Sequence, residues 1–262
     1  MRSLPGWGVA FDESTLRGRV LAAVVGTLYR VALTKASTVF FQNGDDCRYF
    51  VDRHLVAERE VRIVAGTGVN LKKFAFKPMP IGPLIFLMVA RLRKDKGVVE
   101  FSEAARAVRL VHPECRFLIA GQQDHSAGSL SAEELTVIRE AGHVELLGYR
   151  VDIANLLSNC HVFVLPTYYP EGRPRTIQEA LAVGRPVVTT RMPGCHDAIL
   201  PDKNGWLVPR RDSTALEHQL LAIAKDKDRL EEYGLAARRF AVERYDVRQI
   251  NRQMIAAMTG WN

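Results

Sequence analysis

The sequence predicts an α/β protein built on a doubly wound parallel sheet. From residue 84 onward, apolar strand-like segments alternate with helical ones, and the strands show no polar alternation. Continuously apolar strands are typical of a parallel sheet that is covered on both faces, and βα units of this length are typical of a doubly wound fold. Ligands of such folds bind beyond the carboxyl ends of the strands. We therefore expect the functional site in the loops that follow the strands.

Hydrophobic spacing predicts the elements of this sheet and of the helical last quarter. The predicted strands are residues 84–90, 116–120, 144–147, 162–165, 186–190 and 206–208. The predicted helices are residues 96–111 and 153–157, a short helix that ends at Gly184, and then 214–225, 228–245 and 247–258. Ser213 is the expected N-cap of the first helix in the last quarter.

The first 80 residues follow a different plan. They predict helices at 16–35 and 45–54, strands at 38–41 and 61–64, and a linker at 76–80. Two strands and two helices are too few for an independent domain. We therefore interpret residues 1–76 as the C-terminal remnant of a larger Rossmann-like αβ domain, 77–245 as a complete Rossmann-like domain, and 246–262 as a C-terminal helix.

Composition narrows the classes of partner and compartment. The 262 residues carry a formal charge of +7, which favours anionic partners. The chain has no RNA-binding aromatic signature and no long Lys/Arg block, so we expect no nucleic acid partner. Its four cysteines are far apart and form no C-x-x-C pair, which argues against zinc and redox motifs and favours the reducing cytoplasm. We expect Cys115 and Cys160, beside strand-like runs, to be buried thiols.

An apolar run at residues 20–28 lies between Arg19 and Arg30. It is too short to span a bilayer. With Arg17, Lys35 and the positive net charge, it predicts peripheral association with an anionic membrane surface. The alternative is an ordinary helix that packs against a sheet.

The most informative stretch runs from Glu171 to Glu179 and follows the strand at 162–165. Gly172 lets the backbone approach a ligand closely. Pro174 suits the first turn of a helix, whose free N–H groups bind anions such as phosphate. Glu179 can accept hydrogen bonds from a vicinal diol, and Glu171 can reach a second hydroxylated group. Anion donors and diol acceptors in one loop suit a nucleotide sugar.

A second cluster follows the first strand of the main domain, at residues 90–97. Arg91 and Lys96 can flank a diphosphate, since arginine is a forked donor and lysine a point charge. Both clusters follow strands of one parallel sheet, so we expect them at the same edge.

These segments carry a family resemblance. The chain resembles the donor-binding domain of family 4 glycosyltransferases, which are retaining enzymes of the GT-B fold, and within them the bacterial enzymes of surface-polysaccharide synthesis. The resemblance rests on residues 91–97, 148–150, 171–179, 184–188, 193–194 and 204–209, and extends to 39–43 and 66–70. Residues 77–245 would then be the nucleotide-sugar donor-binding domain, and 1–76 would belong to the acceptor-side domain.

The resemblance also implies roles for single residues. Arg91 and Lys96 would hold the donor diphosphate, Glu179 would bind the ribose diol, and Glu171 would contact the transferred sugar and stabilise an oxocarbenium-like transition state. The backbone would touch sugar hydroxyls and phosphate at Gly172, Arg173, Pro174, Arg175 and Thr176. Tyr149 and Arg150 would lie near the base. The resemblance implies neither metal nor cofactor, because fixed cations and a helix N-terminus neutralise the charge.

Two departures from the family pattern affect the expected function. Cys195, His196 and Asp197 stand where relatives commonly have an arginine and a glutamate, and nothing before Thr15 can supply the acceptor-side Gly-rich loop.

We expect transfer of a hexosyl or N-acetylhexosaminyl group from a UDP-linked sugar to a glycan or lipid-linked acceptor, with retention.

A truncated transferase or a nucleotide-sugar-binding subunit without catalysis fits the same residues, and such a chain would self-associate or need a partner that supplies the N-terminal half. A sugar epimerase or a phosphorylase is also possible, although no pyridoxal-phosphate lysine is identifiable for the latter.

Overall fold

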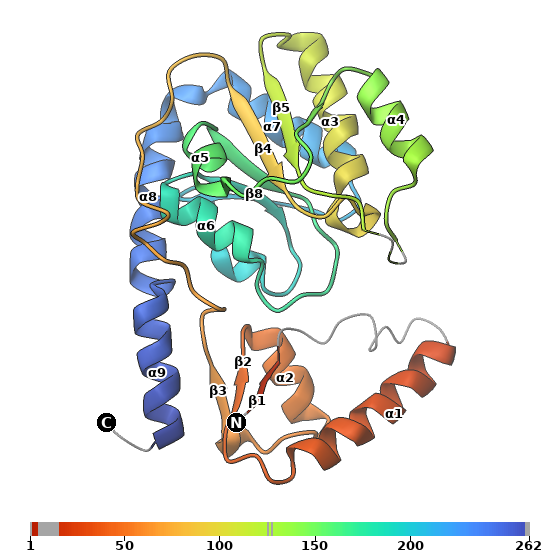
Figure 1. Ribbon diagram of the computed structural model, residues 1–262, viewed down its shortest axis with the longest axis vertical. Coiled ribbons are helices and arrows are strands. Elements are labelled where there is room, and N and C mark those ends of the chain that lie inside the picture. The colour runs from red at the N-terminus through yellow and green to blue at the C-terminus, as the bar shows by residue number, and fades with distance from the viewer. Residues whose placement is uncertain (1, 5–15, 125, 127, 260–262) are drawn as a thin grey trace.

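A computed structural model describes residues 2–4, 16–124, 126 and 128–259. The described chain forms two α/β units, each built on a parallel sheet (Figure 1). The larger sheet runs in the order β6-β5-β4-β7-β8-β9. Its strands are β4 (Ile85–Val89), β5 (Arg116–Ala120), β6 (Glu145–Leu146), β7 (Val162–Leu165), β8 (Val187–Thr190) and β9 (Gly205–Val208). All neighbouring pairs are parallel, as predicted.

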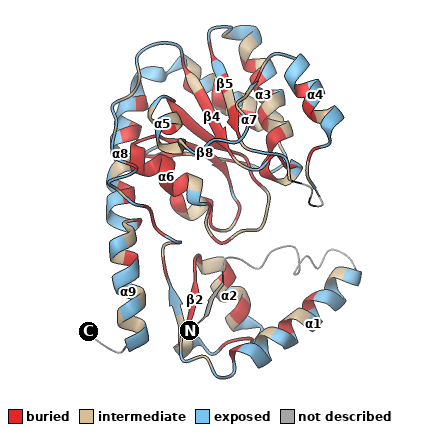
Figure 2. Cartoon of the chain, viewed as in Figure 1, coloured by how far each residue is buried: buried red, intermediate tan, exposed pale blue. Residues whose placement is uncertain are grey.

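Helices cover both faces of this sheet, so β7 and β8 are buried along their whole length (Figure 2). On one face α3 (Val98–Val111) packs beside α7 (Ser213–Lys225). On the other face α6 (Arg175–Val183) packs against α5 (Ile153–Ser158) and α8 (Leu230–Arg244). The continuous apolar strands of the sequence thus mark a sheet with no solvated face.

The strand order has a switch point between β4 and β7. From β4 the chain moves outward to β5 and β6, then returns to β7 and moves the other way to β8 and β9. The connections that follow β4 and β7 therefore lead to opposite halves of the sheet. Open α/β sheets bind their ligands at such a point.

The amino-terminal unit is a three-stranded parallel sheet in the order β1-β2-β3. Its elements are β1 (Arg2–Leu4), α1 (Leu16–Leu33), β2 (Val39–Phe41), α2 (Gly44–Asp52) and β3 (Val61–Ile63). Phe41 packs with Phe50 of α2 in one cluster of buried side chains. Phe40 packs with Ile250 of α9 (Val247–Thr259) in another. The last helix therefore returns to the first unit, as Figure 1 shows.

The structure confirms the doubly wound prediction and differs from it in detail. The sequence patterns missed β1 and also α4 (Ala132–Glu140), although Ser131 and Glu134 form a capping box at the start of α4. Asp212 rather than Ser213 caps α7, since its side chain accepts the N–H of Ala215 at 2.8 Å. A 3₁₀ turn at Lys94–Lys96 precedes α3.

The predicted burial of Cys115 and Cys160 is confirmed. Burial raises the pKa of the Cys115 thiol to about 11 and that of Cys160 to about 12. Cys195 is also buried, and burial raises its pKa to about 12. All three are therefore packed as neutral thiols at neutral pH.

Arg185, fully buried, fastens the linker to the larger unit. Its Nε donates to Leu157 O at 2.8 Å, and its Nη2 donates to Ser158 O and to Pro78 O, both at 2.9 Å. Burial lowers the pKa of this guanidinium. Arg185 thus donates to the last carbonyl groups of α5 and, at the same time, to the linker at Pro78.

Replacing Arg185 by methionine should lower the free energy of unfolding by about 3 kcal/mol, because several buried carbonyls lose a charged donor. Urea unfolding at neutral pH measures this. Arg139→Met, on the exposed face of α4, should change stability by less than about 0.5 kcal/mol. Equal stability of the two variants would contradict the role assigned to Arg185.

Candidate functional site

A cavity of about 220 Å³ lies at the switch point of the larger sheet. The ends of β4 and β7, the loops after them and the start of α6 form its walls. The lining residues are Val89, Ala90, Arg91, Lys96, Leu165, Glu171, Pro174, Arg175 and Thr176. The structure therefore brings the two charged clusters of the sequence to one place.

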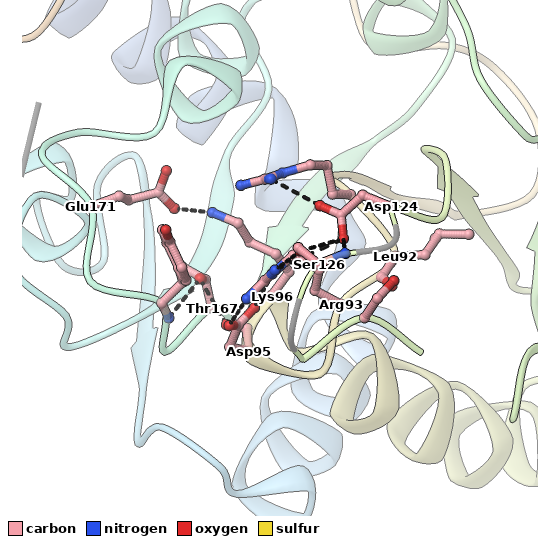
Figure 3. A network of polar contacts seen from close by, with 11 residues as sticks. Leu92, Arg93, Asp95, Lys96, Asp124, Ser126, Thr167 and Glu171 are labelled. Atoms are coloured by element: carbon pink, nitrogen blue, oxygen red, sulfur yellow. Dashed lines mark hydrogen bonds and ion pairs between the residues drawn. The ribbon is translucent and has the colours of Figure 1, made fainter. Parts of the chain in front are cut away.

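Lys96 and Glu171 form an ion pair across this cavity (Figure 3). The Lys96 Nζ lies 2.5 Å from Glu171 Oε1, and the Lys96 side chain is almost fully buried. Gly97 makes the close approach possible, because it has a φ of 82° and a Cβ there would lie 2.3 Å from the carbonyl oxygen of Pro166. The lysine is thus held against the loop that carries Glu171.

Hydrogen bonds tie the loop after β4 to the loop after β7. The carbonyl oxygen of Asp95 accepts from Thr167 Oγ1 at 3.1 Å and from the N–H of Tyr168 at 2.8 Å. Thr167 Oγ1 also accepts from the N–H of Tyr169 at 3.1 Å. Lys96 Nζ lies 4.6 Å from the centroid of the Tyr169 ring. The two walls of the cavity therefore form one connected structure.

Arg91 is held in the cavity wall by an acidic residue that the sequence patterns did not single out. Its Nη1 donates to Asp124 Oδ2 at 2.9 Å, and about half of its side chain remains exposed. The pKa of Asp124 lies below its usual range, mainly because the hydroxyl of Ser126 donates to its carboxylate. The charges of Arg91 and Arg93 lower this pKa further. Arg93 itself forms a forked pair with Asp95 and binds Ser126 (Figure 3). Arg93 is thus a structural residue of the loop.

The start of α6 adds a further positive element to the cavity. The helix begins at Arg175, and Pro174 is its N-cap residue, one position before the predicted first turn. No side chain caps the first N–H groups, and Arg175 and Thr176 line the cavity. Uncapped N–H groups and the helix dipole together favour an anion there.

Glu179 lies one helical turn further along α6 and is not part of the cavity lining. Its side chain is almost fully buried, and its Oε1 accepts from Arg175 Nε at 2.9 Å. Burial raises the pKa of Glu179, and the charge of Arg175 opposes that rise. A buried carboxylate next to the cavity is suited to accept hydrogen bonds from hydroxyl groups.

The side chain of Arg173 turns away from the cavity toward the amino-terminal unit. Its Nε and Nη2 donate to Gln42 O, each at 3.2 Å. Its Nη1 donates to the Tyr245 hydroxyl at 2.9 Å, and its Nη2 also contacts Asp197 Oδ2 at 3.2 Å. Only the backbone of Arg173 therefore remains near the predicted donor site.

The carbonyl oxygen of Gly172 contacts Gly194 and Asn43. A Cβ on Gly194 would lie 1.8 Å from the Gly172 carbonyl oxygen, so these two backbones are in close contact. The same oxygen accepts from Asn43 Nδ2 at 2.7 Å. The missing side chain of Gly194 thus lets its backbone lie against Gly172.

Tyr149 and Arg150 do not line the cavity. They follow β6, and β5 separates β6 from β4 in the sheet. The Tyr149 side chain is exposed, and Arg150 forms a forked pair with Asp152 at 2.8 and 2.6 Å. A ligand that touches both the cavity and Tyr149 must extend along the sheet edge across two strands.

A larger cavity, of about 320 Å³, lies between α3 and α4. Its walls include Val99, Leu130, Val137 and Ile138, and it lies away from the strand ends. We assign function to the smaller cavity, because fixed cations and a helix N-terminus meet there at the switch point of the sheet.

Comparison with known proteins places the chain in a family. The model of "Glycosyl transferases group 1" matches residues 71–240. The chain is 28% identical over 235 residues to the N,N'-diacetylbacillosaminyl-diphospho-undecaprenol alpha-1,3-N-acetylgalactosaminyltransferase of Campylobacter jejuni. This match covers 85% of this chain and 60% of that protein.

It is also 31% identical to the putative colanic acid biosynthesis glycosyltransferase WcaL of Escherichia coli, over 76% of this chain and 51% of that protein. Among solved structures, Anabaena Alr3699/HepE in complex with UDP has a TM-score of 0.79 at 19% identity, and the match covers 98% of this chain and 72% of that one. The chain thus spans a little over half the length of the two curated relatives. With the GT-B type fold confirmed, this chain belongs to the group 1 glycosyl transferases.

Proposed function

We propose that the cavity at the switch point binds the diphosphate of a UDP-linked sugar. The observation that carries this proposal is the convergence of Arg91, Lys96 and the uncapped start of α6 on one cavity that also contains Glu171. An ammonium group has three N–H donors, so Lys96 can hold Glu171 and a phosphate oxygen together. Fixed positive groups stabilise a diphosphate most when it departs with its full charge.

The proposed reaction moves a hexosyl or N-acetylhexosaminyl group to a hydroxyl of a glycan or lipid-linked acceptor. The bond between the anomeric carbon and the diphosphate oxygen breaks, and a bond to the acceptor oxygen forms on the same face of the sugar. The acceptor proton passes to the departing diphosphate. The carboxylate of Glu171, beside Lys96, stabilises the positive charge that develops on the sugar ring.

The nucleoside would extend from the cavity along the sheet edge. Glu179 lies one turn beyond the cavity wall, where its carboxylate would accept the two ribose hydroxyls. Tyr149 offers an exposed ring near the end of β6, where the base would lie, with Arg150 beside it. The backbone from Gly172 to Thr176 would contact phosphate and sugar hydroxyls.

The names of the relatives suggest the acceptor class. One relative is named for a diphospho-undecaprenol substrate, and another for colanic acid biosynthesis. We therefore place this chain in surface-polysaccharide synthesis at the inner face of the cell membrane. The second candidate function is donor binding without transfer, since Arg91, Lys96 and the start of α6 account for diphosphate binding by themselves.

Calorimetry with UDP tests the diphosphate site. Lys96→Met should weaken UDP binding by about 1.5–3 kcal/mol, since a buried charged contact is lost. Arg91→Ala should cost less, because half of that side chain is exposed and screened by solvent. Lys94→Ala is the matched control in the same loop, since Lys94 pairs with Glu134 and does not line the cavity.

The same proteins distinguish the two candidate functions. UDP release from UDP-N-acetylgalactosamine and UDP-galactose in the presence of a lipid-linked acceptor supports transfer, and UDP binding without release supports the binding subunit. Unchanged UDP affinity in both Lys96→Met and Arg91→Ala would remove the diphosphate assignment.

The pH dependence of UDP binding tests Glu179 separately. Glu179→Gln should weaken binding roughly ten-fold near neutral pH, because a charged acceptor is lost. Burial raises the pKa of Glu179, so the wild-type carboxylate takes up its proton closer to neutral pH than an exposed glutamate does. The difference between wild type and variant should therefore shrink as the pH falls from about 7.5 to about 5. Protonation of UDP affects both proteins alike, so a constant difference would contradict the ribose role.

We also propose that α1 lies on an anionic membrane surface. Leu16, Val20, Val24, Leu28 and Val31 follow helical spacing and are all exposed. The helix has no acidic residue, and Arg17, Arg19 and Lys35 are exposed at its ends. An apolar face with basic flanks suits the interface of anionic lipids. In the part of the chain that the structure describes, no helix is long and apolar enough to cross a membrane.

Flotation with vesicles of phosphatidylglycerol and phosphatidylcholine tests this surface. The wild-type chain should bind at low salt and dissociate at high salt, because its flanking charges are screened. Val24→Ser with Leu28→Ser should reduce binding, whereas Val137→Ser, at an equally exposed apolar position on α4, should not. Dimerisation through α1 without vesicle binding would show that a second copy covers this face instead.

A further inference from the structure

The first turn of α2 docks on the loop that carries Glu171. Asn43, the N-cap residue of α2, is fully buried. Its Oδ1 accepts the N–H of Asp46 at 2.8 Å, and its Nδ2 donates to the carbonyl oxygen of Gly172 at 2.7 Å. The same amide also contacts Asp46 Oδ2 at 3.0 Å. One side chain thus caps a helix of the amino-terminal unit and binds the carbonyl of Gly172, the residue that follows Glu171.

Neighbouring contacts join the same segments. Gln42 O accepts the guanidinium of Arg173, next to the Asn43 contact. Asp45 Oδ2 lies 3.5 Å from His196 Nε2, which also lies 2.9 Å from Asp197 Oδ1. Residues 42, 43 and 45 therefore contact residues 172, 173 and 196 in one small area. The two units meet at the loop that carries the proposed catalytic carboxylate.

We infer that Asn43 is a positioning residue that acts through Gly172 and places Glu171 beside Lys96. This inference rests on the proposed function of Glu171. A buried carbonyl that loses its donor is costly, so the loop is expected to shift if the Asn43 amide is removed. Because reaction rates fall steeply with small misplacements of a catalytic group, that shift reaches the chemistry. The amino-terminal unit thereby helps to set the geometry of the donor site.

Two substitutions separate this role from helix capping. Asn43→Asp and Asn43→Ser both keep an oxygen that can cap α2. Aspartate lacks the amide donor, and the serine hydroxyl is one bond too short to keep both contacts. One variant adds a charge and the other does not, so a shared effect excludes charge as its cause. Ser131→Ala is the matched control, because it removes a cap from α4 on another part of the molecule.

Amide hydrogen exchange of the full chain provides the first measurement and needs no activity. Both Asn43 variants should exchange faster than wild type in residues 167–174, and Ser131→Ala should not change that segment. If residues 167–174 exchange alike in wild type and both Asn43 variants, the inference is wrong.

Turnover provides the second measurement, as UDP released from UDP-N-acetylgalactosamine or UDP-galactose. Both Asn43 variants should lower kcat roughly ten-fold or more with little change in the donor KM, since placement of Glu171 and not donor binding is affected. A loss no larger than that of Ser131→Ala would overturn the inference. If the wild-type chain binds UDP and releases none from either donor, the transfer proposal fails, and hydrogen exchange alone then decides on Asn43.

Discussion

The ion pair between Lys96 and Glu171 is the interaction on which the site depends. A buried ammonium group without a counter-charge costs several kcal/mol, so the position of Lys96 fixes the position of Glu171. Two features of the loops after β4 and β7 keep the two residues close together. Gly97 allows the chain to pass against Pro166, and Thr167 ties its loop to the backbone of Asp95. The pair therefore connects the two halves of the sheet at the point where the strand order reverses.

The arrangement separates positive and negative groups along the proposed ligand. Arg91, Lys96 and the start of α6 lie where a leaving diphosphate would gather charge. Glu171 lines the same cavity and Glu179 lies one turn further along α6, where in the proposed complex they would accept the hydroxyl groups of the sugar and the ribose. Lys96 pairs with Glu171 and in the proposed complex would also hold the diphosphate, so the position of the leaving group would be coupled to that of the carboxylate. A rigid site of this kind stabilises charge without reorganisation during the reaction.

The strands of the larger sheet, and the residues that directly follow them, could be predicted from local sequence patterns. The strands of the larger sheet were recognisable because a parallel sheet that is buried on both faces requires continuous apolar runs. The meeting of Arg91, Lys96 and Glu171 followed, since each comes directly after a strand. The direction of a long side chain was not predictable, because tertiary contacts decide it. Arg173 turns to Gln42 and Tyr245, which are far from it in sequence. The strand β1 has only three residues, which is too short for a recognisable hydrophobic pattern. The start of α4 could have been predicted from its capping box, Ser131 and Glu134.

The contacts between the units explain why a donor site should respond to the unit beside it. The last helix, α9, packs Ile250 against Phe40 and so fixes the amino-terminal sheet from one side. On the other side, Arg173 and Asn43 fasten the end of β2 and the start of α2 to the Glu171 loop. A tilt of the amino-terminal unit would therefore act on the Gly172 carbonyl through Asn43. Since Gly172 directly follows Glu171, such a movement would also reach the carboxylate paired with Lys96. The contact of Asn43 with Gly172 would thus couple the relative position of the two units to the geometry of the cavity.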